Sequence, residues 1–179
     1  MSDAVTLMQE ADRARREGRP ADAHRDFVAA ISLCRADGDR RGLIRALKGL
    51  GQIERDLGHA EAARPLYEEA VLLCRAEQDG ILLAHTVRHL GDVYHAVGRP
   101  DLAEPCLREA LALYRGNAAT APLDLANALR PLAILEESAG RPAEAARLWA
   151  EARGLYASAS VAEGVAECSA RLAAIGATP

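Results

Sequence analysis

One phrase recurs four times along the 179-residue chain, and its spacing is the strongest constraint on the fold. The four copies read GRPADAHRDFVAAI, GHAEAARPLYEEAV, GRPDLAEPCLREAL and GRPAEAARLWAEA. They begin at Gly18, Gly58, Gly98 and Gly140, so the period is 40, 40 and 42 residues. A fixed period of roughly 20 to 50 residues is typical of stacked supersecondary units. The chain is therefore expected to fold as an array of similar units.

Each glycine separates two segments with apolar residues at helical spacing, and long alternating β-branched runs are absent, so the expected fold class is all-α. Ala and Leu dominate the apolar content, and both are strong helix formers. The expected helix pairs are 3–17 with 20–36, 41–57 with 60–76, 81–97 with 100–115, and 123–139 with 142–157. A last segment from Val161 repeats only the first-helix pattern. We expect it to cap the array, with Glu163, Glu167 and Arg171 covering the exposed final face.

Small residues recur seven positions before the turn glycines. They are Ala11, Gly51, Gly91 and Ala133. We expect them on the face between paired helices, where close approach leaves no room for a larger side chain. Another position reads Cys34, Cys74, Tyr114 and Tyr156 in successive units, which indicates a packing site. Cys106 and Cys168 are isolated, and no CxxC pair occurs, so all four thiols are expected to be reduced.

The net charge of −4 gives no general reason to expect a nucleic acid or an anionic membrane as a partner. The first twenty residues are charged throughout and lack an apolar signal core. No uncharged run reaches the roughly 20 residues that span a bilayer. A cytoplasmic protein is the resulting expectation.

The repeated positions resemble the tetratricopeptide repeat (TPR). The third unit carries the pattern most completely, with Leu90-Gly91, Tyr94, Gly98, Ala103, Leu107 and Ala110. The second unit matches nearly as well, the first and fourth more loosely. The period and the phrases ARPLYEEAV and AEPCLREAL resemble the longer variety found in kinesin light chains.

The resemblance implies a right-handed α-solenoid of four hairpins plus a capping helix in one domain, residues 1–179. The repeats are placed at 3–37, 41–77, 81–116 and 123–158, and the cap at 160–175. It also implies a non-catalytic protein-interaction scaffold without a cofactor, because this repeat serves many partners.

In this family the first helices line a concave groove. The stripe beside the core then predicts the groove residues. The first two units contribute Val5, Met8, Asp12, Arg15, Arg45, Lys48, Gln52 and Arg55. The last two contribute His85, Arg88, His89, Asp92, His95, Asn127, Arg130, Ile134 and Glu137.

Six of these side chains are cations and three are anions, so the predicted groove carries +3. That sign favours an acidic peptide or partner helix. Arginines that merely solvate an exposed face are the plain alternative. A chaperone-tail carboxylate clamp fits poorly, because His89, Asn127 and Pro131 stand where the clamp has Asn, Lys and Arg.

Two further readings stay open. The cap could support self-association through Val165, Leu172 and Ile175. His85, His89 and Asp92 share one helical face and could contribute to a metal or catalytic site, although no general base lies between the histidines. The few serines show no nucleophile pattern and the glycines form no phosphate loop.

Overall fold

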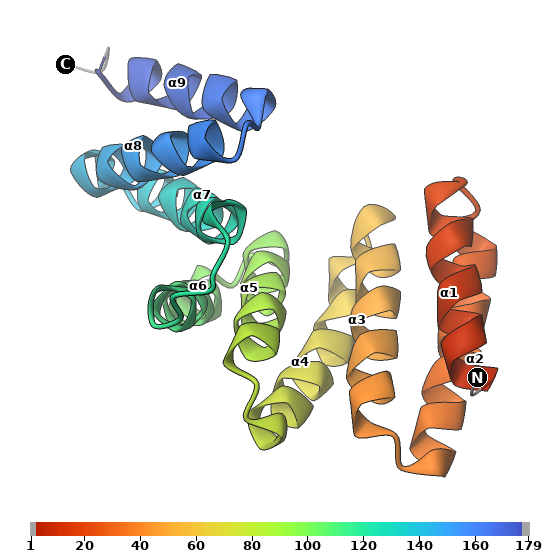
Figure 1. Ribbon diagram of the computed structural model, residues 1–179. Coiled ribbons are helices and arrows are strands. Elements are labelled where there is room, and N and C mark those ends of the chain that lie inside the picture. The colour runs from red at the N-terminus through yellow and green to blue at the C-terminus, as the bar shows by residue number, and fades with distance from the viewer. Residues whose placement is uncertain (1–2, 177–179) are drawn as a thin grey trace. The chain divides into compact units, whose positions relative to one another are not determined.

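The computed structural model describes residues 3–176, and every secondary-structure element in this range is an α-helix (Figure 1). The helices are α1 (Asp3–Arg16), α2 (Pro20–Asp37), α3 (Arg40–Asp56), α4 (Ala60–Glu77), α5 (Gly80–Ala96), α6 (Pro100–Arg115), α7 (Pro122–Ser138), α8 (Pro142–Ser158) and α9 (Ala162–Gly176). Each predicted helix boundary lies within two residues of the observed one. The all-α prediction is confirmed over these residues. Residues 1–2 and 177–179 of the predicted domain lie outside them.

The four turn glycines have left-handed backbone conformations, with φ between 70° and 79°. A side chain in this region is strained, so glycine is the favoured residue. The next backbone N–H then donates to a carbonyl five residues back, as in Arg99 to Tyr94 at 2.8 Å and His59 to Glu54 at 2.8 Å. This Schellman-type closure satisfies a carbonyl that the helix end would leave unpaired. The chain can therefore reverse direction in very few residues.

Contacts divide the chain into two compact units, residues 1–79 and 80–179. In the first unit, α1 packs on α2, α3 packs on α4, and α3 also contacts both helices of the first hairpin. Two glycines of α3 make this possible. A Cβ at Gly49 would lie 2.3 Å from the Phe27 ring, and one at Gly51 would lie 2.7 Å from the Tyr67 ring. The prediction of small residues at the helix crossing is confirmed at Gly51.

The second unit pairs α5 with α6 and α7 with α8, while α7 contacts both helices of the preceding hairpin and α9 packs on α8. A Cβ at Gly91 would lie 2.7 Å from Cγ of Leu107. The recurring Cys/Tyr position is buried in all four repeats, which confirms its role as a packing site. Cys106 is only half-buried, and none of the four cysteines forms a disulfide among the described residues.

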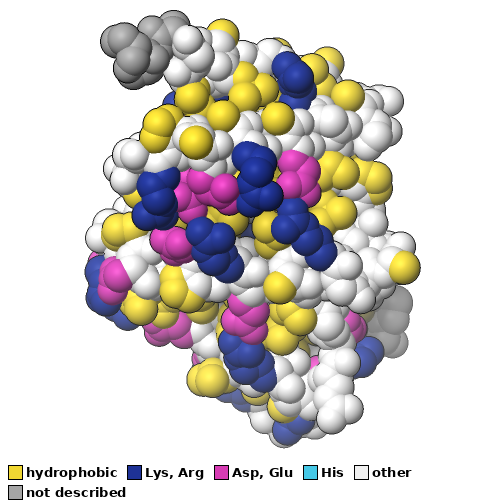
Figure 2. All heavy atoms as spheres, turned by 90° about the vertical axis from the view of Figure 1, so that its left-hand side faces the viewer, with side chains coloured by type: hydrophobic (Ala, Val, Ile, Leu, Met, Phe, Trp, Pro, Cys, Tyr) yellow, Lys and Arg dark blue, Asp and Glu magenta, His cyan; other side chains and the backbone are white. Residues whose placement is uncertain are grey.

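Ion pairs tie neighbouring second helices together within each unit. Arg35 binds both carboxylate oxygens of Glu69 at 2.7 and 2.8 Å, and Arg115 binds Glu151 in the same way at 2.6 and 2.8 Å. Figure 2 shows basic and acidic side chains alternating in a band across one face. Such exposed pairs contribute little stability individually, on the order of 0 to 1 kcal/mol. Their regular placement instead specifies how adjacent hairpins align.

Candidate functional site

The first helices of the first unit present a basic surface, which we call the α1/α3 face. It carries Arg15 on α1 and Arg45, Lys48, Gln52 and Arg55 on α3. Arg15 and Arg45 are exposed, whereas Lys48, Gln52 and Arg55 are half-buried. Met8, predicted on this stripe, is instead buried in the core at 2% exposure.

Two carboxylates lie among these cations. Arg45 pairs with Asp12 at 3.1 Å, which links α3 to α1. Arg15 lies 3.8 Å from Asp56, and the Gln52 amide donates to the same carboxylate at 2.6 Å. Counted over these side chains alone, four cations and two anions give the α1/α3 face a formal excess of two positive charges.

The corresponding surface of the second unit, the α5/α7 face, is built on two tyrosine hydroxyls. Nδ1 of His85 lies 2.8 Å from the Tyr114 hydroxyl, and Oδ1 of Asn127 accepts from the Tyr156 hydroxyl at 2.9 Å. The tyrosines occupy the recurring packing position at the ends of α6 and α8, so their hydroxyls reach the first helix of the same hairpin. Both groove side chains are therefore held in one orientation.

Burial of Tyr114 disfavours its charged form and raises the pKa of the phenol to about 12. This value lies above the roughly 10 of an unfolded tyrosine. The neutral phenol therefore contributes stability that is complete below pH ~10 and is lost as the pH rises toward 12.

We expect the unfolding free energy of the wild type to fall between pH 10 and 12 by about 2 kcal/mol more than that of Tyr114→Phe. Urea titrations of both proteins at pH 8, 10 and 11.5 measure the difference. Equal losses in the two proteins would show that Tyr114 does not cause it.

Arg88 lies at the centre of the α5/α7 face, with a side chain only 14% exposed. Its guanidinium donates to Asp92 at 3.2 Å and to Nε2 of His89 at 2.9 Å. A guanidinium has only donors, so this nitrogen of His89 is the acceptor. Nε of Arg88 is buried without a hydrogen-bond partner among the described residues.

His89 shares its repeat position with Gly49 and Arg171. A Cβ at Gly49 would meet Phe27 of α2, and the Arg171 guanidinium lies 5.9 Å from the centroid of Trp149 of α8, so in α3 and α9 this position faces the preceding second helix of the same unit. The proposed metal set of His85, His89 and Asp92 gains no geometric support. Within residues 3–176, no group of three or more His, Cys, Asp or Glu side chains is placed to hold a metal ion.

The capping helix α9 places two charged side chains, Glu167 and Arg171, against α7. Arg130 of α7 binds both oxygens of Glu167 at 2.7 Å, and Arg171 pairs with Glu137 at 3.1 Å. The Arg130 hydrogen bond holds the pKa of Glu167 below its usual value. Glu167 and Arg171 were predicted to cover the exposed final face of the array. They instead join α9 to α7.

These pairs change the charge of the second unit. Arg88, Arg130 and Arg171 lie against Asp92, Asp124, Glu137 and Glu167, with Asp124 placed 3.9 Å from His85. Three cations face four anions, and the half-buried His95 adds no charge while it is neutral. The excess of positive charge thus lies on the α1/α3 face.

Sequence reasoning missed Asp56, Asp124 and the partners on α9. One signal could have found Glu167: in register with the repeats, it takes the same position as Arg45 and His85.

Comparison with known families identifies the repeat. A tetratricopeptide repeat model matches residues 60–116 and 81–158, which together span more than half of the chain. The chain belongs to the tetratricopeptide repeat family. No curated protein matches its sequence.

Solved structures share the TPR-like fold. BtubC (BKLC) from P. vanneervenii superposes with a TM-score of 0.79 at 21% identity, over 88% of this chain and 64% of that one. The chain thus spans less than two thirds of BtubC. Kinesin light chain TPR-like repeats from Podosopora anserina superpose with a TM-score of 0.73 at 14% identity, over 99% of this chain and 98% of that one. MamA protein superposes with a TM-score of 0.64 at 17% identity, over 97% of this chain and 91% of that one. At these identities the likeness shows the fold alone, an α-helical repeat of the solenoid type.

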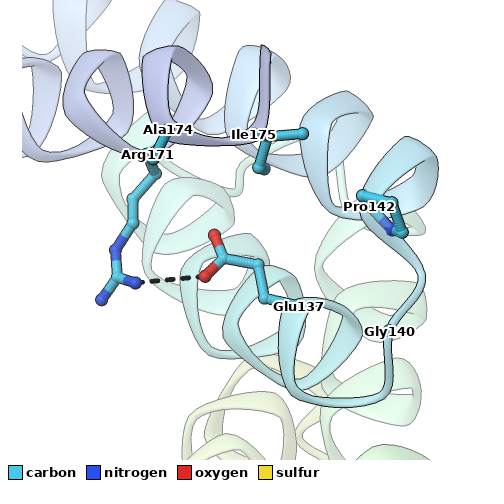
Figure 3. A pocket seen from close by; sticks show the side chains of 6 residues that line it. All are labelled: Glu137, Gly140, Pro142, Arg171, Ala174 and Ile175. Atoms are coloured by element: carbon cyan, nitrogen blue, oxygen red, sulfur yellow. Dashed lines mark hydrogen bonds and ion pairs between the residues drawn. The ribbon is translucent and has the colours of Figure 1, made fainter. Parts of the chain in front are cut away.

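A pocket of about 430 Å³ opens beside α9 in the second unit (Figure 3). Glu137 and Arg171 face each other across it, and Gly140, Pro142, Ala174 and Ile175 complete its lining. It lies at the end of α7 rather than on the α5/α7 face. None of the TPR helices within residues 3–176 is both long and apolar enough to cross a membrane.

Proposed function

We propose that this TPR protein is a non-catalytic interaction scaffold that binds an acidic peptide or partner helix on the α1/α3 face. The observation that carries the proposal is the excess of two positive charges on that face. Arg15 and Arg45 are exposed, and their carboxylate partners lie at the surface as well. A ligand carboxylate can therefore exchange with Asp12 or Asp56 without uncovering a buried charge.

The α5/α7 face supplies a different chemistry in this proposal. His85 and Asn127 are oriented by tyrosine hydroxyls, so they are suited to hydrogen bonds with a polar ligand. Arg88 and Arg130 already have carboxylate partners, so they contribute less attraction for an acidic chain. Four cysteines without a disulfide fit a reducing compartment, and we place the protein in the cytoplasm on that basis.

A double charge reversal tests the proposal. We expect Arg45→Glu with Lys48→Glu to weaken capture of salt-eluted partners from the native cell extract by at least about tenfold, because the face changes from +2 to −2. The matched control is Arg25→Glu with Arg64→Glu, which reverses two arginines on α2 and α4. Both variants are first checked for wild-type helicity. Unchanged capture by the α3 variant would refute binding at this face.

A further inference from the structure

The α9 helix is built as a first helix, yet no second helix covers it within residues 3–176. In the four hairpins the covered face is marked by contacts such as Gly51 with Tyr67 and Gly91 with Leu107. The residues at this position and seven before it are buried in every hairpin. Their counterparts in α9, Ala166 and Ala173, are exposed. The surface formed by Ala166, Ala170 and Ala173 is called the α9 free face below.

The α9 free face continues into an apolar cleft between α8 and α9. This cleft has a volume of about 360 Å³. Its lining is Ala157, Ser160, Val161, Ala162, Val165 and Ala166. Apart from Ser160 these side chains are short and apolar, so the cleft has room for larger apolar groups from a partner.

Arg153 lies on α8 four residues before Ala157, which lines the cleft. The equivalent residues Ile31, Val71 and Leu111 are buried in the earlier second helices, at 5–7% exposure. Arg153 is exposed, and no ion pair is seen between it and another described side chain. A helix laid on the α9 free face would bring one flank toward this cation.

We propose that the α9 free face binds one amphipathic helix of a partner protein, in the place that a second helix takes in each hairpin. The chain itself shows which residues such a helix needs. Every second helix carries a buried bulky residue with alanine four residues before and three after it, and in the second and third hairpins this bulky residue lies against the small residue of the first helix. The four sets are Ala23-Phe27-Ala30, Ala63-Tyr67-Ala70, Ala103-Leu107-Ala110 and Ala145-Trp149-Ala152, all buried. The partner helix therefore carries Ala-x3-bulky-x2-Ala and a carboxylate that meets Arg153.

A second copy of this chain fits the surface less well. Its own α9 would bring alanine against alanine, with no bulky residue to fill the cleft. Glu167, which lies in the middle of that helix, is already bound to Arg130 and is not free for Arg153.

A further repeat of the same type is also a poor occupant. Adjacent second helices are joined by Arg35–Glu69 and Arg115–Glu151. In α8 the residue equivalent to Arg35 and Arg115 is Ala157. A glutamate of a following second helix would therefore find no arginine to pair with there. A partner helix whose carboxylate pairs with Arg153 does not need that missing arginine.

The probe is a fluorescein-labelled peptide with the sequence of residues 20–37, which carries the required spacing and three aspartates, Asp22, Asp26 and Asp37. We expect it to bind the full chain saturably in anisotropy titrations at low salt. Ala173→Arg should weaken binding at least about tenfold, because the longer side chain occupies the site. Ala112→Arg, at an exposed alanine of α6, is the matched control and should bind as wild type.

A charge exchange separates this site from the α1/α3 face. Arg153→Glu should weaken binding about fivefold, and a peptide with Asp22→Lys and Asp26→Lys should restore it. The Arg45→Glu, Lys48→Glu variant should bind the probe as wild type does. If that variant alone loses the probe, the peptide binds the α1/α3 face and the α9 proposal is wrong.

Two other results would also overturn it: no saturable binding, or equal binding by Ala173→Arg. Sedimentation of the full chain adds a last check. A dimer that Ala173→Arg dissolves would show that a second copy, not a partner helix, covers α9.

Discussion

Replacing Gly91 by leucine is expected to lower the free energy of unfolding by about 3 kcal/mol or more. A Cβ at this position would lie 2.7 Å from Cγ and 2.8 Å from Cδ2 of Leu107, well inside van der Waals contact. Leu107 is fully buried and cannot swing into solvent. The new side chain can be housed only if α5 and α6 move apart, which opens their shared interface.

Gly154→Leu is the matched control, since it makes the same substitution within another helix. Gly154 is exposed on α8, its φ is not positive, and no atom lies within 4 Å of a Cβ placed there. Leucine has the higher helix propensity, so this variant should gain up to about 1 kcal/mol. Urea unfolding followed by circular dichroism measures both. A Gly91→Leu protein as stable as the wild type would mean that the hairpin is loosely packed.

Such local detail could be predicted because the repeat aligns one position four times. A single Gly91 in a helix says little, but glycine or alanine at Ala11, Gly51, Gly91 and Ala133 indicates a crossing without room for a side chain. The turn glycines give equally direct information, because only a left-handed residue closes the hairpin there. Fold class and helix ends were predictable for this reason.

The charge of the site was less predictable, because each ion pair joins residues whose spacing the repeat does not reveal. Arg130 binds Glu167 on α9, and Arg15 lies near Asp56 on α3. Periodicity places a residue on a face of its own helix, but side-chain length and direction decide which neighbour it reaches. The predicted basic groove is therefore retained as a proposal for the α1/α3 face, where cations outnumber carboxylates.

Glu136 is fully buried, which is rare for a glutamate. Its side chain is 0% exposed, and it binds Arg108 of α6 at 2.8 Å together with Arg141 of the α7–α8 turn. One buried carboxylate thus joins a hairpin to its neighbour. The two arginines remain about half exposed, at 49% and 48%, so only the acid is fully removed from water.

Glu136→Gln should therefore lower the free energy of unfolding by about 2 to 3 kcal/mol. The amide has nearly the same shape, but one of the two carboxylate oxygens becomes an NH2 group, which places N–H donors against a guanidinium that can only donate. Glu104→Gln is the matched control, because Glu104 pairs with the same arginines at 2.9 and 3.2 Å but lies at the surface. We expect Glu104→Gln to lower the free energy of unfolding by less than about 0.5 kcal/mol. Equal losses in the two variants would show that ion-pair number, rather than burial of the carboxylate, determines how strongly the hairpins hold together.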